Sequence, residues 1–74
     1  MKHRHPRVIQ LSVNGEVKQV ERGASIARLV DSLDLAGKRI AIERNGEIVP
    51  RSRYAETPVA EGDRLEIVVA VGGG

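Results

Sequence analysis

The chain has 74 residues, and 12 lysines and arginines against 10 acidic residues give a formal net charge of +2. This length allows one small domain with a single core, and it leaves no room for an enclosed active-site cleft of the usual size. The absence of cysteine excludes disulfides, thiolate metal sites and cysteine nucleophiles. No apolar stretch has the length of a signal-peptide core or a membrane span, so we expect a soluble cytoplasmic protein without a membrane partner.

Residues 1–7 form a basic segment that we expect to be a flexible leader. Its charged and ionisable side chains are Lys2, His3, Arg4, His5 and Arg7. The two histidines lack a third ligand nearby, so they do not predict a metal site.

A strand is predicted for residues 7–13, because apolar side chains alternate there with period two. The inward set is Ile9, Leu11 and Val13. Asn14-Gly15 then predicts a type I′ hairpin turn, because both residue types tolerate a positive φ. Residues 16–21 return as a second, more polar strand, whose pattern leaves open which of its two valines points inward.

An amphipathic helix of about two and a half turns is predicted next. Ser25 is a good N-cap, and one apolar stripe follows it at helical spacing. The stripe consists of Ile26, Leu29, Val30 and Leu33. A stripe this short is more often part of a core than a surface for a partner helix. Gly37 is predicted to cap the end of the helix.

The second half of the chain reads as three short strands separated by turns. Residues 40–43 alternate, Asn45-Gly46 repeats the hairpin signal, and residues 47–49 continue as a strand. Residues 51–57 are polar and predict a loop with a single helical turn, which Tyr54 pins to the core.

A last strand is predicted for residues 65–71, after a tight turn at Glu61-Gly62-Asp63. Its apolar residues in phase with the core are Leu65, Ile67, Val69 and Val71. Val68 and Ala70 are out of phase, so we expect them on the sheet face that the helix leaves open.

This order of elements predicts an α+β fold of the ubiquitin-like, β-grasp type. One helix covers one face of a mixed sheet of four to five strands, and the domain spans residues 8–71. In that arrangement the first and last strands are parallel neighbours at the centre of the sheet.

The residues predict no catalytic site. Both histidines lie in the leader, and neither Ser12 nor Ser52 has a base near it in sequence. The acidic residues are spread over strand and turn positions that we expect to face solvent. No phosphate-binding loop or dinucleotide motif is present, so we expect no cofactor bound by this chain. Tyr54 is the only aromatic residue, which argues against single-stranded nucleic acid as a partner.

The sequence ends in three glycines, Gly72 to Gly74, which we expect to form a flexible tail. Three glycines at a given end arise by chance about 3 times in 10,000. Glycines make the thinnest possible chain, and three of them span about 10 Å. A frayed end is the alternative. A carboxylate on Gly74 becomes reactive once an enzyme that uses ATP and Mg²⁺ couples it to AMP.

Several of these segments resemble the ThiS family, the sulfur carriers of thiamine biosynthesis. They are Asn45-Gly46-Glu47-Ile48-Val49-Pro50-Arg51, Tyr54, Glu61-Gly62-Asp63-Arg64-Leu65-Glu66-Ile67-Val68 and the final glycines. The resemblance covers about residues 8–74. It differs from the family pattern in the basic leader and in the third glycine, which leaves open whether Gly72 is more than a spacer.

The resemblance implies a protein co-substrate, not an enzyme. A ThiF-type enzyme adenylates the carboxylate of Gly74 after Gly72 and Gly73 thread into its active site. Sulfur from a cysteine desulfurase or another donor then gives a thiocarboxylate, which passes the sulfur to thiazole synthase. Docking candidates are Val68, Ala70, Arg64 and Arg51. The two arginines either steer an acidic partner or are simply solvated.

Three other functions compete with this interpretation. One is a sulfur carrier for molybdopterin synthesis or another pathway, against which Tyr54 and the turn at Pro50 favour the thiamine branch. Another is a ubiquitin-like modifier joined to lysines through Gly74. The third is a basic domain that binds RNA, which the weak net charge disfavours.

Overall fold

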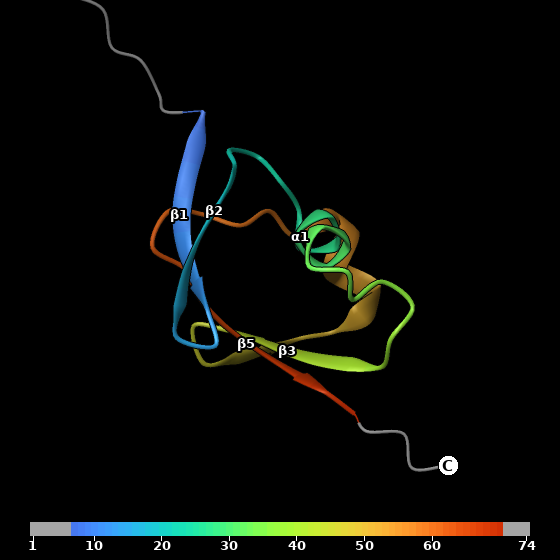
Figure 1. The fold of residues 1–74 in the computed structure, drawn as a ribbon. Helices are drawn as coiled ribbons and strands as arrows, with labels where there is room; N and C mark the ends of the chain where they lie inside the picture. The colour runs from blue at the N-terminus through green and yellow to red at the C-terminus, as the bar shows by residue number, and fades with distance from the viewer. Residues whose placement is uncertain (1–6, 71–74) are drawn as a thin grey trace, which may run out of the picture.

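The computed structural model describes residues 7–70, which form one curved sheet around two short helices (Figure 1). The elements in chain order are β1 (Val8–Val13), β2 (Glu16–Glu21), α1 (Ile26–Ser32), β3 (Ile40–Arg44), β4 (Glu47–Val49), the 3₁₀ helix η1 (Arg51–Glu56) and β5 (Arg64–Val69). The predicted helical turn around Tyr54 is η1. All five expected strands form within the described residues.

The sheet has the strand order β2-β1-β5-β3-β4, which places β5 at its centre. β5 pairs in parallel with β1 and antiparallel with β3. The parallel neighbours predicted from the sequence are therefore confirmed. β1 begins at one end of the molecule and β5 stops at the opposite end (Figure 1).

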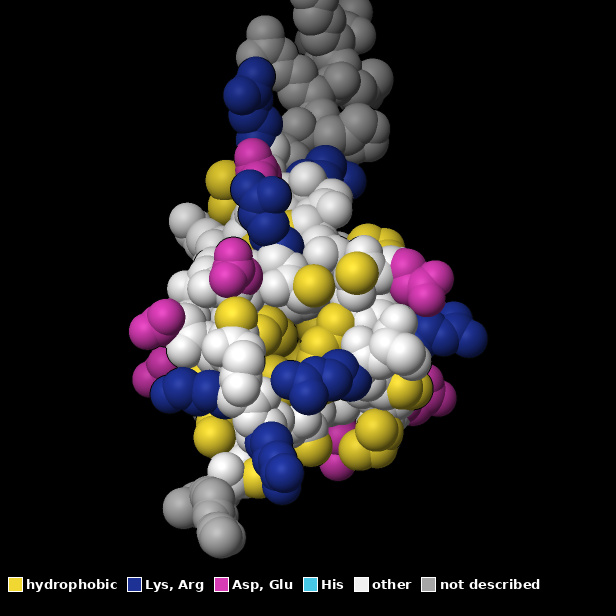
Figure 2. Space-filling view, turned by 90° about the vertical axis from the view of Figure 1, so that its right-hand side faces the viewer, with side chains coloured by type: hydrophobic (Ala, Val, Ile, Leu, Met, Phe, Trp, Pro, Cys, Tyr) yellow, Lys and Arg dark blue, Asp and Glu magenta, His cyan; other side chains and the backbone are white. Residues whose placement is uncertain are grey.

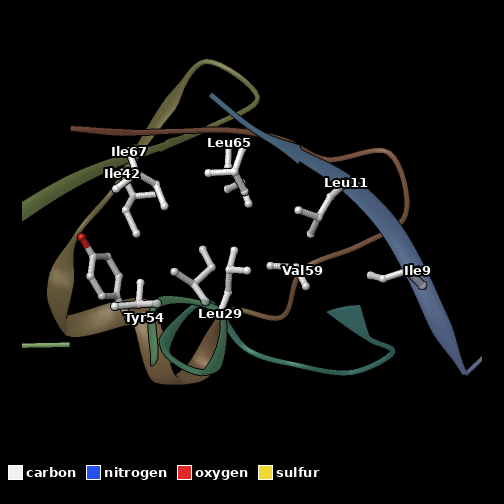
Figure 3. Packing of buried hydrophobic residues seen from close by; sticks show 11 residues of the cluster. Ile9, Leu11, Leu29, Ile42, Tyr54, Val59, Leu65 and Ile67 are labelled. Atoms are coloured by element: carbon white, nitrogen blue, oxygen red, sulfur yellow. The ribbon is translucent and has the colours of Figure 1, made fainter. Parts of the chain in front are cut away.

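The core lies between the concave face of the sheet and the two helices (Figure 3). It contains the predicted alternating set of β1 and the first three residues of the helical stripe. The buried apolar residues are Ile9, Leu11, Val13, Ile26, Leu29, Val30, Ile42, Tyr54, Val59, Leu65 and Ile67. Each fully buried aliphatic side chain contributes about 1.5–3 kcal/mol, which explains why so short a helix is stable against the sheet.

Both Asn-Gly pairs adopt the predicted hairpin geometry. Asn14 and Asn45 have φ of 53° and 52°, and the glycine after each also has a positive φ. In β2, Val20 packs against the core and Val17 is exposed, which settles the question that the sequence left open.

The prediction that Gly37 caps the helix is wrong. The helix ends at Ser32, and Asp34 takes the left-handed conformation with a φ of 63°. The backbone N–H of Leu35 donates to Val30 O at 3.0 Å, and that of Asp34 donates to Asp31 O at 3.1 Å. This is a Schellman motif three residues earlier than expected, in which an aspartate stands where glycine is commonest. Leu35 packs against the core and thereby favours this ending.

Candidate functional site

The candidate site is the central strand β5, whose two ends differ in their surroundings. The strand begins beside Asp63, which is only 6% exposed. The prediction that acidic residues face solvent is therefore wrong for Asp63. Its carboxylate accepts hydrogen bonds from Arg44 Nε at 2.8 Å, from Asn45 Nδ2 at 3.1 Å and from the backbone N–H of Ala60 at 2.8 Å.

These contacts determine the charge state of Asp63. Burial alone would raise the pKa of its carboxyl group, because it penalises the ionised form. The hydrogen bonds from Asn45, Ala60 and Arg44 outweigh burial, and the positive charge of Arg44 acts in the same direction. The pKa of Asp63 therefore lies below its ordinary value, and the group is ionised at neutral pH.

Two asparagines hold β5 from opposite sides. The amide oxygen of Asn45 accepts from the backbone N–H of Arg64 at 2.8 Å. The amide of Asn14 makes two bonds with Ile67, accepting from its N–H at 2.8 Å and donating to its carbonyl at 3.1 Å. The backbone ladder between β1 and β5 ends at Val13 and Leu65, so the side chain of Asn14 extends that ladder beyond the end of β1.

The far end of β5 is exposed and apolar. Val68 is 64% exposed, and Ala70 also faces solvent. The prediction that Val69 belongs to the core is wrong, because Val69 is 41% exposed and lies beyond Ile67, the last buried residue of β5. Val68 lies opposite the exposed Ala41 of β3, on the sheet face away from α1. The last backbone hydrogen bond within the described residues runs from Ala70 N to Arg39 O, at 2.9 Å.

Basic side chains surround this end of the strand. Lys38, Arg39 and Arg51 are all exposed, and Arg51 Nη2 donates to Lys38 O at 3.2 Å. Figure 2 shows lysine and arginine side chains near the end of the molecule at which the described chain stops. Arg64 is also exposed but lies six residues before Ala70, about 20 Å away along the strand.

The structure therefore separates the predicted docking residues into two places. Val68, Ala70 and Arg51 belong to the C-terminal end of β5, and Arg64 belongs to its start. The predicted tail residues Gly72, Gly73 and Gly74 lie outside the described residues, as do Val71 and residues 1–6 of the leader. The docking and threading roles remain predictions.

Sequence reasoning missed Asn14 and Asp63 as the residues that fix β5. Asn14 was recognised only as a turn former, and its partner Ile67 lies 53 residues away in the chain. Among residues 7–70, no group of three or more histidine, cysteine or acidic side chains could hold a metal ion. No helix in this part of the chain is long and apolar enough to cross a membrane.

Known proteins are similar to this chain in sequence and fold. A model of the ThiS family matches residues 3–74. The sulfur carrier protein ThiS of Bacillus subtilis is 40% identical over 65 residues, which cover 86% of this chain and 98% of that protein. A thiazole synthase of Paramagnetospirillum magneticum is 41% identical over 66 residues, which cover 89% of this chain. The chain spans only 20% of the length of that synthase.

A solved structure supports the same relationship. The crystal structure of the thiamine biosynthesis protein ThiS from Geobacter metallireducens matches with a TM-score of 0.76 at 30% identity. The match covers 89% of this chain and 100% of that one. The predicted β-grasp fold is thereby confirmed, and the chain belongs to the ThiS family.

Proposed function

We propose that this chain is a sulfur carrier of thiamine biosynthesis that acts as a consumed and recharged co-substrate, not as an enzyme. The observation that carries the proposal is the asymmetry of β5 in a member of the ThiS family. The strand is fixed at its start by buried polar contacts, and its exposed end leads directly into the segment that finishes with Gly72 to Gly74.

The chemistry takes place at the carboxylate of Gly74. In the active site of a ThiF-type enzyme with ATP and Mg²⁺, a carboxylate oxygen attacks the α-phosphorus of ATP, and pyrophosphate leaves. Sulfide then attacks the acyl carbon, the bond to the AMP oxygen breaks, and AMP leaves. The product is a thiocarboxylate. Where a cysteine-desulfurase persulfide supplies the sulfur, a thiol must also reduce the acyl disulfide formed first.

Thiazole synthase is the proposed sulfur acceptor. Two relatives named thiazole synthase contain a segment similar to this chain, at 41% and 33% identity. Joining a carrier and an acceptor in one chain raises the effective concentration of each for the other. The exposed Val68, Ala70 and Arg51 are proposed to guide docking. Val68 and Ala70 are at the end of the described chain, and Arg51 donates to Lys38 O, next to Arg39, whose carbonyl accepts from the N–H of Ala70.

The test is intact-mass analysis of the protein after incubation with a ThiF-type enzyme, ATP, Mg²⁺ and sulfide. We expect a mass gain of one sulfur minus one oxygen, with release of pyrophosphate. Deleting Gly74, or the substitution Gly73→Leu, should abolish both without altering the circular dichroism spectrum. A chain lacking residues 1–6 is the matched control, since that truncation affects the opposite end of the molecule.

Two outcomes would contradict the proposal. AMP formation at the normal rate by the chain without Gly74 would show that the tail is not the substrate. High-mass conjugates in place of the sulfur adduct would instead indicate a modifier of lysines.

A further inference from the structure

Strand β2 is at one edge of the sheet, and half of its backbone groups face away from β1. A two-residue turn joins the two strands, so the first residue of β2, Glu16, exchanges backbone hydrogen bonds with β1, and every second residue after it does the same. The hydrogen bond from Arg22 N to Arg7 O, at 2.7 Å, continues this alternation. The N–H and C=O groups of Val17 and Gln19 therefore point outwards, where no strand among residues 7–70 pairs with β2.

Two side chains of β2 decide what can pair with this edge. Val17 is 69% exposed, more than any other large apolar side chain between positions 7 and 70. Lys18 opposes pairing, because a lysine on an edge strand usually discourages the addition of another strand. Its Nζ lies 3.7 Å from Oε1 of Glu16, and both side chains are accessible to solvent. A strand that pairs with β2 must therefore bring an acidic side chain to Lys18.

A second copy of β2 meets this condition in one antiparallel register. Opposite residues of a ladder have their side chains on the same face of the sheet. Glu16 and Lys18 share the face that carries α1, because their partners in β1 are core residues, whereas Glu21 is on the other face. Lys18 can therefore be opposite Glu16 of the second copy but not opposite Glu21. This register places Val17 opposite Val17 on a two-fold axis and repeats the Glu16–Lys18 pair on both sides of it.

We propose that two copies of this chain pair edge to edge through β2, with Val17 opposite Val17. Because the backbone groups of Val17 point outwards, the two copies exchange two hydrogen bonds at the axis. Two pairs of opposite charge flank this contact, and the two valines meet on the other face of the sheet. The formal net charge of +2 produces little repulsion between copies. The paired segment is short, so the dimer belongs to the weak interfaces that bury less than about 1,200 Å².

This pairing leaves the exposed end of β5 free in each copy. Val17 is opposite Ser12 of β1, and Ser12 is opposite Arg64 at the start of β5. Ala70 lies about 20 Å further along β5. Both copies can therefore meet another protein through that end, and the inference goes beyond the proposed function without depending on its chemistry.

The first test uses single cysteines, because the chain has none of its own. In a glutathione redox buffer, Val17→Cys should give a disulfide-linked dimer, since the two Cα atoms at the axis are about 5.5 Å apart. The two thiols lose two protons and two electrons, which reduce one oxidised glutathione to two thiols. Gln19→Cys is the matched control on the same edge and face, but its two thiols lie about 13 Å apart along the strands in this register. Equal or greater cross-linking of Gln19→Cys would overturn the inference.

The second test exchanges the charges and measures self-association by sedimentation equilibrium. Glu16→Lys and Lys18→Glu should each weaken the dimer about 10-fold, because each substitution places like charges opposite each other twice. The double variant should associate as wild type does, because every charge again meets its opposite. An equimolar mixture of the two single variants should also pair, since the lysines of one face the glutamates of the other. Thermal unfolding should be unchanged in all of them, because the ion pair within each copy is exposed.

Two results of the second test would contradict the pairing. Wild type that stays monomeric at about 1 mM, a concentration at which weak interfaces are populated, would show that the edge of β2 does not accept a second copy. A double variant as weak as the single variants would show that Glu16 and Lys18 do not face each other across the axis.

Discussion

The two ends of β5 have opposite surroundings. At its start, Asp63 is buried and fully hydrogen-bonded, and the backbone of Arg64 is held by Asn45. At its end, Val68 and Val69 are apolar and face solvent. A strand needed only for folding would gain from covering that end. The difference indicates that β5 is an anchored support, whose exposed end is kept available for another protein.

The largest effect on stability is expected from Asp63→Asn. The amide loses the negative charge opposite Arg44, and its NH₂ group cannot accept the bonds that the carboxylate accepts. Breaking a buried pair costs 3–5 kcal/mol, and partial exposure of Arg44 favours the lower limit, so we expect a loss of about 3 kcal/mol. Urea unfolding measures it.

If the start of β5 serves stability and its exposed end serves binding, Asp63→Asn should still bind its partner. Below its melting temperature, Asp63→Asn should bind the ThiF-type enzyme as wild type does. The reason is that Asp63 and its hydrogen-bond partners lie at the start of β5, away from the exposed end. A large loss of affinity in the folded variant would show that the two ends of β5 are not independent.

The converse experiment changes the exposed end. Val68→Asp places a charge where apolar contact with a partner is proposed, and we expect binding to weaken about 30-fold, or roughly 2 kcal/mol. Stability should change by less than about 0.5 kcal/mol, since Val68 is exposed. Val17→Asp is the control, because Val17 is equally exposed on the edge strand β2. Equal losses of affinity for both variants would remove the special role of the end of β5.

A smaller effect on stability is expected from Asn14, whose side chain bonds to Ile67 in the middle of β5. Asn14→Gly removes both side-chain bonds to Ile67 and keeps a residue that tolerates the positive φ. Each bond contributes about 1 kcal/mol net, so we expect a loss of 1–2 kcal/mol. Hydrogen exchange should accelerate at the amide of Ile67 more than at that of Ile42 in β3. Uniform acceleration across the sheet would contradict a local role.

The fold could be predicted because its signals are local. Alternation in β1, the two Asn-Gly turns and the stripe from Ile26 to Val30 each depend on neighbouring residues, and the structure confirms them. The exposed state of Val68 follows from the same alternation, so the surface of the proposed site was also accessible to sequence reasoning.

The contacts of Asp63 and Asn14 that fix β5 could not be predicted, because they join distant parts of the chain. Asp63 bonds to Arg44, 19 residues away, and Asn14 bonds to Ile67, 53 residues away. An aspartate in a turn is usually exposed, and nothing near Asp63 in sequence reveals the guanidinium that it meets. The end of α1 was missed for a related reason, since packing of Leu35 against the core outweighs the preference for glycine after a helix.

The smallest effect is the pH dependence that Asp63 gives to stability. Its pKa in the folded protein lies below the ordinary aspartate value of 3.8, which we expect in the unfolded chain. Between these two values the unfolded chain binds more protons, so stability rises with pH there. The contribution is fully present above the unfolded value and is lost as the pH falls through the folded one. The difference in unfolding free energy between wild type and Asp63→Asn should therefore be constant near neutral pH and shrink below about pH 4. A difference that stays constant through that range would mean that the hydrogen bonds around Asp63 do not favour its ionised form, and the start of β5 would then lack the electrostatic anchor that distinguishes it from the exposed end.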